Sequence, residues 1–203
     1  MFGLPSSTEI KKQLPKKAIY AKFDMKPAQR DSFDADISRI DIVAMLSPRT
    51  IPALAEGEEV KEIYVLSVQL KKKDYDTKNI ALLSKLIPHK MVFALHYEDE
   101  IQFAIFHTKL ITSAWQLITH NSQLITLQGL SLDVVWENIV KSIGHIEVEE
   151  GKTLTEQIKA TEEQAKLLAQ IKTLERKMAS EKQPRRKREY FEQIKKLKTA
   201  LSF

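Results

Sequence analysis

The sequence contains no cysteine among its 203 residues, and this absence excludes several classes of protein. Without cysteine the chain can form no disulfide, no thiolate zinc site, no iron–sulfur cluster and no cysteine nucleophile. Small secreted domains usually depend on disulfides, whereas proteins of reducing compartments do not. We therefore expect a cytoplasmic protein.

Glycine and long apolar runs are also scarce. Five glycines disfavour a backbone phosphate cradle, and the chain has no phosphate-binding loop, dinucleotide fingerprint, HExxH or GxSxG pattern. Classical nucleotide hydrolysis and serine hydrolysis are therefore disfavoured. No stretch reaches the roughly 18 consecutive apolar residues of a membrane span. The first 17 residues are too charged for a secretory signal, so we expect no membrane association.

The spacing of apolar residues predicts an α+β domain over residues 1–150. Helical periods and caps predict helices over residues 6–14, from Pro27 onwards, from Asp76 or Thr77 to Pro88, and from Ser131 or Asp133 to residue 143. Alternating or β-branched segments predict strands over residues 39–46, 60–71, 90–97, 101–108, 112–116 and 123–128. The sequence predicts a mixed sheet of about five strands flanked by helices.

Residues 151–203 have a different composition, rich in Glu, Lys, Gln, Ala and Leu. Apolar residues recur there at spacings of four and three on both sides of Pro184: Leu167, Ile171, Leu174, Met178, Tyr190, Ile194, Leu197 and Leu201. Two such seams predict a C-terminal antiparallel helical hairpin. Each seam is too short for a firm coiled-coil assignment, so we favour packing within the chain and keep a homodimer as an alternative.

Positive charge is concentrated in the hairpin. The segment from Arg176 to Lys198 contains ten Lys or Arg and three Glu, whereas the net charge of the whole chain is only +5. The cations of this segment form our hypothesis for a nonspecific, salt-sensitive nucleic-acid contact: Arg185, Arg186, Lys187, Arg188, Lys195, Lys196 and Lys198. The competing interpretation is a solvated helix face on which these cations pair with Glu189 and Glu192.

The five histidines show no metal-ligand spacing, and we predict no metal site. His96 and His107 would share one face of a hairpin, diagonally displaced, but two ligands do not make a site. The acidic turn from Glu98 to Glu100 is interpreted as solvated turn charge.

One arrangement supports an alternative, enzymatic hypothesis. The order of the expected elements resembles that of restriction-endonuclease-like nucleases. It is a helix, a strand with Asp41, a strand that ends in Gln69, Leu70 and Lys71, a second helix and a third strand. In those enzymes carboxylates hold a divalent cation, here Mg²⁺, and a lysine assists the attack of water on phosphate. Gln69 replaces the usual second carboxylate.

Several segments together resemble an uncharacterised bacterial family, domain of unknown function 4391. They are residues 14–20 (LPKKAIY), 46–48 (LSP), 70–71 (LK), 87–88 (IP) and 129–133 (GLSLD), within a similar region from about Phe2 to Ile143. The resemblance implies a neighbourhood of helicases and methyltransferases in defence loci, and hence such an enzyme as partner. We therefore expect an accessory or interaction protein without cofactor, more a binding protein than an enzyme, whose basic hairpin contacts nucleic acid or a partner.

Overall fold

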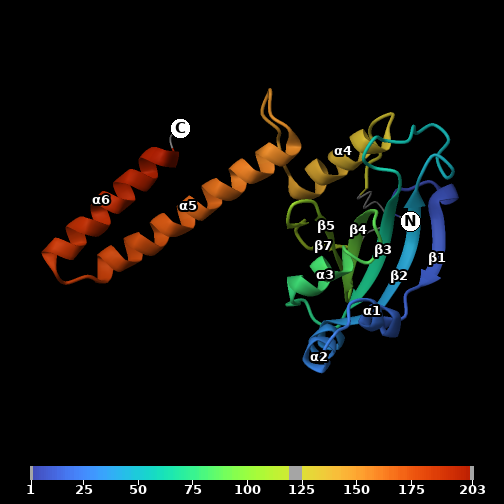
Figure 1. Cartoon of the computed structure of the whole chain (residues 1–203), viewed down its shortest axis with the longest axis horizontal. Coiled ribbons are helices and arrows are strands. Elements are labelled where there is room, and N and C mark those ends of the chain that lie inside the picture. Colours follow the sequence, from blue (N-terminus) through green and yellow to red (C-terminus); the bar gives the residue numbers. More distant parts are fainter. Residues whose placement is uncertain (1, 119–124, 202–203) are drawn as a thin grey trace. The chain divides into compact units, whose positions relative to one another are not determined.

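The computed structural model describes residues 2–118 and 125–201. The chain divides into two compact units, Met1–Glu147 and Val148–Phe203. The first unit contains the sheet and the second the C-terminal helices (Figure 1). The domain boundary that we expected between residues 150 and 151 stays a prediction.

A mixed sheet forms the centre of the first unit, with strand order β1-β2-β3-β4-β5-β6. All neighbouring strands are antiparallel except β3 and β4, which are parallel, and the short β7 also pairs with β5. The strands are β1 (Glu9–Gln13), β2 (Ile37–Leu46), β3 (Ile63–Leu70), β4 (Lys90–Tyr97), β5 (Glu100–Phe106), β6 (Leu110–Thr112) and β7 (Gln116–Leu117). The α+β class is confirmed, with more strands than expected.

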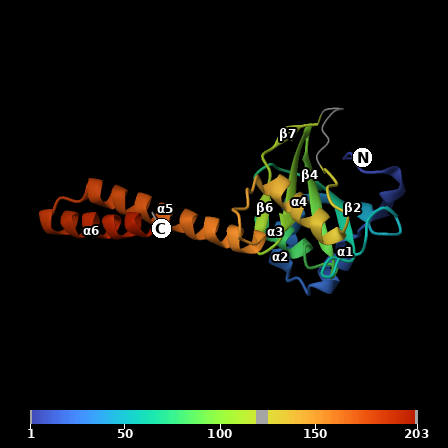
Figure 2. The same cartoon turned by 90° about the horizontal axis from the view of Figure 1, so that it is seen from above.

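Helices cover the two faces of the sheet. Three of them, α1 (Lys16–Lys22), α2 (Pro27–Asp36) and α3 (Thr77–Leu83), bury Ile19, Phe33 and Ile80 in one core with alternate residues of β2, β3 and β4. The fourth, α4 (Leu132–Gly144), packs against β5 and β6 and buries its own apolar stripe, including Val135, Trp136 and Ile139. Figure 2 shows the unit from above, with α4 nearest the viewer. Because both faces are covered, β4 is buried from Met91 to Leu95.

The N-terminal segment differs from our prediction of a helix over residues 6–14. A single 3-10 turn, Ser6–Thr8, precedes strand β1, which pairs with β2 through Glu9–Ala44 and Gln13–Asp41. The Thr8 hydroxyl donates to the carbonyl of Pro5 at 2.7 Å instead of capping a helix. The helical prediction was wrong because a short polar segment has little intrinsic preference, and pairing with the edge of β2 decides its conformation.

Other boundaries shift by a few residues. Strand β2 begins at Ile37, which the apolar spacing assigns to the preceding helix, and α3 ends at Leu83 rather than at Pro88. The predicted strand over residues 123–128 falls partly on residues 123 and 124, which lie outside the described residues, and residues 125–128 form no strand. Asp76 caps α3 as predicted, since its carboxylate accepts from the amide of Lys78 at 2.9 Å.

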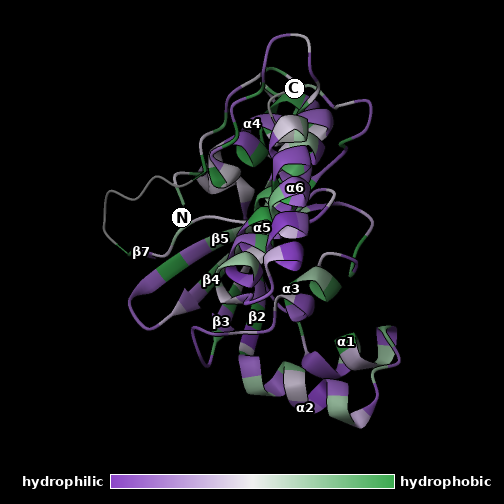
Figure 3. Cartoon of the chain, turned by 90° about the vertical axis from the view of Figure 1, so that its left-hand side faces the viewer, coloured by the Kyte–Doolittle hydropathy of each residue, from purple (hydrophilic) through white to green (hydrophobic). Residues whose placement is uncertain are grey.

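The second unit is a helical hairpin of α5 (Leu154–Ser180) and α6 (Pro184–Leu201), which pack together as predicted. Thr153 and Glu156 form a capping box at the start of α5. Ile171 and Ile194 are buried, and Lys198 pairs with Glu175 across the two helices at 3.0 Å. Figure 3 shows that hydrophilic residues predominate along α6. Within residues 2–118 and 125–201, no helix has the length and apolar character needed to span a membrane.

Candidate nucleic-acid interface on helix α6

Helix α6 contains all seven cations of the nucleic-acid hypothesis. Two of them form ion pairs: Arg185 with Glu189, at 3.5 Å between Nε and Oε1, and Lys198 with Glu175 of α5. Among the described residues the other five form no ion pair: Arg186, Lys187, Arg188, Lys195 and Lys196. Pairing with nearby glutamates therefore accounts for two of the seven cations, and five remain available to an external anion.

The position of the cations along α6 adds to this argument. The helix starts at Pro184, its first turn has no acidic residue, and Arg185 to Arg188 follow directly. The amino end of a helix carries a partial positive charge, so each cation there costs about 0.3–1 kcal/mol of helix stability. These cations and the positive end of the helix dipole repel each other. A bound phosphate relieves this repulsion, because its negative charge offsets both the cations and the helix dipole.

One exposed aromatic ring lies among these cations. The side chain of Phe191 is 54% exposed, whereas that of its neighbour Tyr190 is half-buried. Lys187, Phe191 and Lys195 are four residues apart, which places them on one face of α6. This face therefore combines positive charge with an exposed ring, the two features that nonspecific binders of single strands use.

The hairpin also has a groove of about 580 Å³ between its helices. Its lining residues come from α5 and α6: Ala169, Gln170, Thr173, Leu174, Gln193, Lys196 and Leu197. A groove with Leu174 and Leu197 in its wall is compatible with the homodimer alternative, which stays a prediction.

The three residues of the nuclease alternative lie near one another but are not arranged as in a metal site. Asp41 lies on β2 opposite Ser67, and Gln69 lies on β3 opposite Arg39. The carboxylate of Asp41 is held by Arg39 through two hydrogen bonds of 2.7 and 3.0 Å. Lys71 follows the end of β3, and its side chain is exposed. The expected order of elements, α2, β2, β3, α3 and β4, is present.

A divalent cation does not fit this arrangement. Mg²⁺ prefers several oxygen ligands with at least one or two carboxylates, but the only carboxylate of the three residues is already neutralised by Arg39. Within the part of the chain that the structure describes, no three His, Asp or Glu side chains gather in a metal-binding cluster. Nuclease activity stays a prediction.

His96 and His107 are separated in the fold. His96 pairs with Ile101 beside the β4–β5 turn, whereas His107 follows the opposite end of β5. The two rings therefore lie at opposite ends of the ladder, too far apart to bind one ligand. Burial lowers the pKa of His96, whose ring lies 6.1 Å from that of Phe2. In the acidic turn, Glu100 pairs with Lys73 at 2.5 Å, as a solvated surface charge would.

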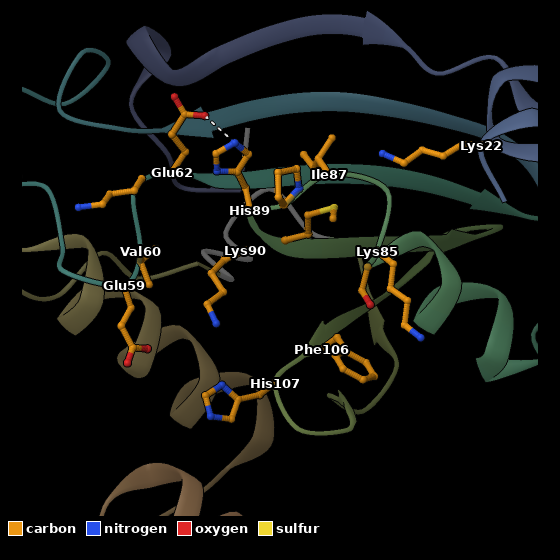
Figure 4. Close-up of a pocket in the computed structure, with 14 residues that line it drawn as sticks. Lys22, Glu59, Val60, Glu62, Lys85, Ile87, His89, Lys90, Phe106 and His107 are labelled. Carbon is orange, nitrogen blue, oxygen red and sulfur yellow. Dashed lines mark ion pairs between the residues drawn. The ribbon is translucent and has the colours of Figure 1, made fainter.

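The sequence did not predict a pocket of about 630 Å³ that lies where the central strands β3 and β4 begin (Figure 4). It brings together His89 and His107 with lysines from separate segments, among them Lys22, Lys85 and Lys90. The only sequence signal was the pair His89-Lys90 at the start of β4, and one such pair does not indicate a site.

Comparison with known proteins identifies a family match that covers nearly the whole chain. A family model described as "Domain of unknown function (DUF4391)" matches residues 2–201. No curated protein and no solved structure matches. The match extends well beyond Ile143, where the similar region was expected to end, and it therefore includes both helices of the hairpin.

Proposed function

We propose that this chain, which belongs to the DUF4391 family, is an accessory protein that contacts nucleic acid without sequence specificity through helix α6. The observation that carries the proposal is the set of five cations on α6 that form no ion pair among the described residues. Lysine and arginine side chains neutralise phosphates and release the counterions that had been bound to the nucleic acid. This release supplies most of the affinity of nonspecific binding.

The proposal gives α6 no role in base recognition. Arginine can pair with a guanine edge, but a run of adjacent arginines and lysines at one helix end suits the phosphate backbone, which carries no sequence information. A helicase or methyltransferase partner, which the resemblance implies, is compatible with this surface because such enzymes hold the strand that α6 would contact. The partner and the defence role stay predictions.

Phe191 provides a test of which form of nucleic acid α6 prefers. We expect Phe191→Ala to lower the affinity for a single strand about tenfold, because stacking on an exposed ring contributes about 1–3 kcal/mol per base. The affinity for a duplex, whose bases are already stacked, is expected to change less than about twofold. Fluorescence anisotropy with labelled single-stranded and duplex DNA of one sequence measures both.

Two variants make this test specific. Phe191→Trp keeps a flat aromatic surface and is expected to retain single-strand affinity. Leu168→Ala removes another exposed apolar side chain, 57% accessible on α5, and is expected to have no effect. If Phe191→Ala lowered the affinity for single strand and duplex equally, the ring would stabilise the helical hairpin and would not stack on a base.

A further inference from the structure

The pocket of Figure 4 lies where β3 and β4 begin and β5 ends, all within the first unit. Its volume of about 630 Å³ falls within the range of about 300–1,000 Å³ that small-molecule sites occupy. Its lining comes from α1, the loops before β3 and β4, and the end of β5, so only the folded sheet assembles it.

Positive charge exceeds negative charge in this pocket. Four lysines line it, against two glutamates: Lys22, Lys61, Lys85 and Lys90, with Glu59 and Glu62. Glu62 is engaged, since its carboxylate accepts from the Tyr64 hydroxyl at 2.7 Å and lies 3.7 Å from Nε2 of His89. The electrostatic balance of the lining favours an anion.

The four lysines differ in the hydrogen bonds and ion pairs that they already form. Lys22 donates to the carbonyl of Leu86, and Lys61 donates to the carbonyl of Gly57 at 2.8 Å and pairs with Glu56 at 3.4 Å. Lys85 and Lys90 have no ion pair in the described part of the chain. These two lysines are therefore the ones that can take up an anionic group.

Lys90 and His107 lie side by side. The antiparallel β4–β5 ladder ends at the pair Val92–Ile105, and Lys90 and His107 each follow two residues beyond that pair, where both line the pocket. The Lys90 ammonium stands 5.7 Å from the ring centre of Trp136 of α4, which holds it as a cation over an aromatic face. Figure 4 shows the amino end of Lys90 and the ring of His107 turned toward each other, and both residues line the pocket.

The charges around His107 fit an anion as ligand. Burial first, and then Lys90, lower the pKa of His107, while Glu59 of the loop before β3 and Glu137 of α4 act in the opposite direction. The imidazole is therefore neutral near pH 7 and lies next to an ammonium. A neutral imidazole keeps one N–H, which can donate to a bound anion, and the anion would also offset the charge of Lys90.

The wall beside Lys90 is fixed in place. The carboxylate of Asp133 accepts from the amides of Glu58 at 2.6 Å and Val60 at 2.8 Å, which ties the loop before β3 to α4. Gly57 allows this approach, because a Cβ there would lie 2.3 Å from the Asp133 carboxylate. The loop that carries Glu59 is thus positioned before any ligand enters.

We propose that this pocket binds a small phosphate monoester, with its phosphate at Lys90 and His107 and its organic part against Ile87, Met91 and Phe106. The apolar residues form the remaining wall of the same pocket, and Met91 is buried while Ile87 and Phe106 are half-buried. A phosphate with an apolar substituent matches both parts of the lining. The site is independent of α6.

Calorimetry with the full chain tests this site, using AMP, adenosine and inorganic phosphate as probes. We expect AMP to bind, adenosine to bind at least about tenfold more weakly, and Lys90→Met to weaken AMP binding about tenfold or more, as for loss of a charged hydrogen bond. Lys78→Met on α3, an exposed lysine outside the pocket, is the matched control and is expected to bind AMP normally. His107→Gln, at the second residue of the proposed phosphate site, is the alternative variant in case Lys90→Met fails to fold, and it is expected to weaken AMP binding as well.

Competition identifies the source of the phosphate. Displacement of AMP by a 5′-phosphorylated but not a 5′-hydroxyl oligonucleotide would identify a nucleic-acid end, and displacement by neither would identify a free metabolite. Absence of both AMP and phosphate binding at millimolar concentration, or equal binding of AMP and adenosine, would overturn the proposal. A variant of α6 that loses nucleic-acid binding but still binds AMP separates this result from the proposed function.

Discussion

A variant with Lys187, Arg188, Lys195 and Lys196 replaced by glutamine is expected to bind single-stranded DNA about 10²–10³-fold more weakly at about 0.1 M salt. Each lysine or arginine that neutralises a phosphate on a single strand contributes a salt slope of about 0.7, so four contacts together account for this loss. Glutamine keeps helix propensity close to that of lysine and arginine, so α6 is expected to stay folded. Fluorescence anisotropy measures the affinity and circular dichroism checks the helix.

The control for this variant removes the same charge from the first unit. Lys12, Lys17, Lys78 and Lys109 are exposed and form no ion pair within residues 2–118 and 125–201. Replacing these four by glutamine is expected to lower affinity less than about threefold, through net charge alone. Equal losses in the two variants would show that overall charge, and not α6, binds the strand.

The largest expected effect on stability is at Asp36. Its side chain is buried, and the carboxylate accepts from the amide of Asp76, from Asn79 and from Lys72, each at 2.8 Å. These contacts join the end of α2 to the start of α3. We expect Asp36→Ala to lower the free energy of unfolding by about 3 kcal/mol, because it takes the carboxylate acceptor away from the buried Asn79 amide and from the Asp76 amide. Urea unfolding measures the difference.

The effect of Asp36 also depends on pH. Burial alone would raise its pKa, but the hydrogen bonds from Lys72, Asp76 and Asn79 outweigh burial and lower the pKa below the ordinary value of 3.8. The carboxylate therefore contributes stability fully above the unfolded pKa and loses it as pH falls through the folded pKa. The difference between wild type and Asp36→Ala should shrink as the pH falls below 3.8 and through the lower pKa of the folded state. Asp31→Ala, at an exposed position of α2, is the control and should cost less than about 0.5 kcal/mol.

The parts of the fold that the sequence predicted have strong periodicity or clear caps. The strands from Lys90 to Phe106 and the two hairpin helices have such patterns, and Asp76 and Thr153 mark helix starts through their own hydrogen bonds. Strand β1 could not be predicted, since its conformation follows from pairing with β2 across more than 25 residues of sequence.

The candidate site was predictable only in part. The cations of α6 are adjacent in sequence, so their concentration is visible in the chain itself. Their pairing is not, because Glu175 reaches Lys198 across 23 residues only once α5 and α6 are packed. The pocket with Lys90 and His107 depends on the register of β4 against β5 and on α4, and one sequence does not determine that register.

The most direct test of the α6 interface is the salt dependence of single-strand binding by the full chain and by the glutamine variant of α6. The proposed interface predicts a log–log slope near −3 or steeper for the wild type between about 50 and 300 mM salt, reduced by about 3 in the variant. A flat dependence for the wild type, or the same slope for both proteins, would contradict nucleic-acid contact through α6.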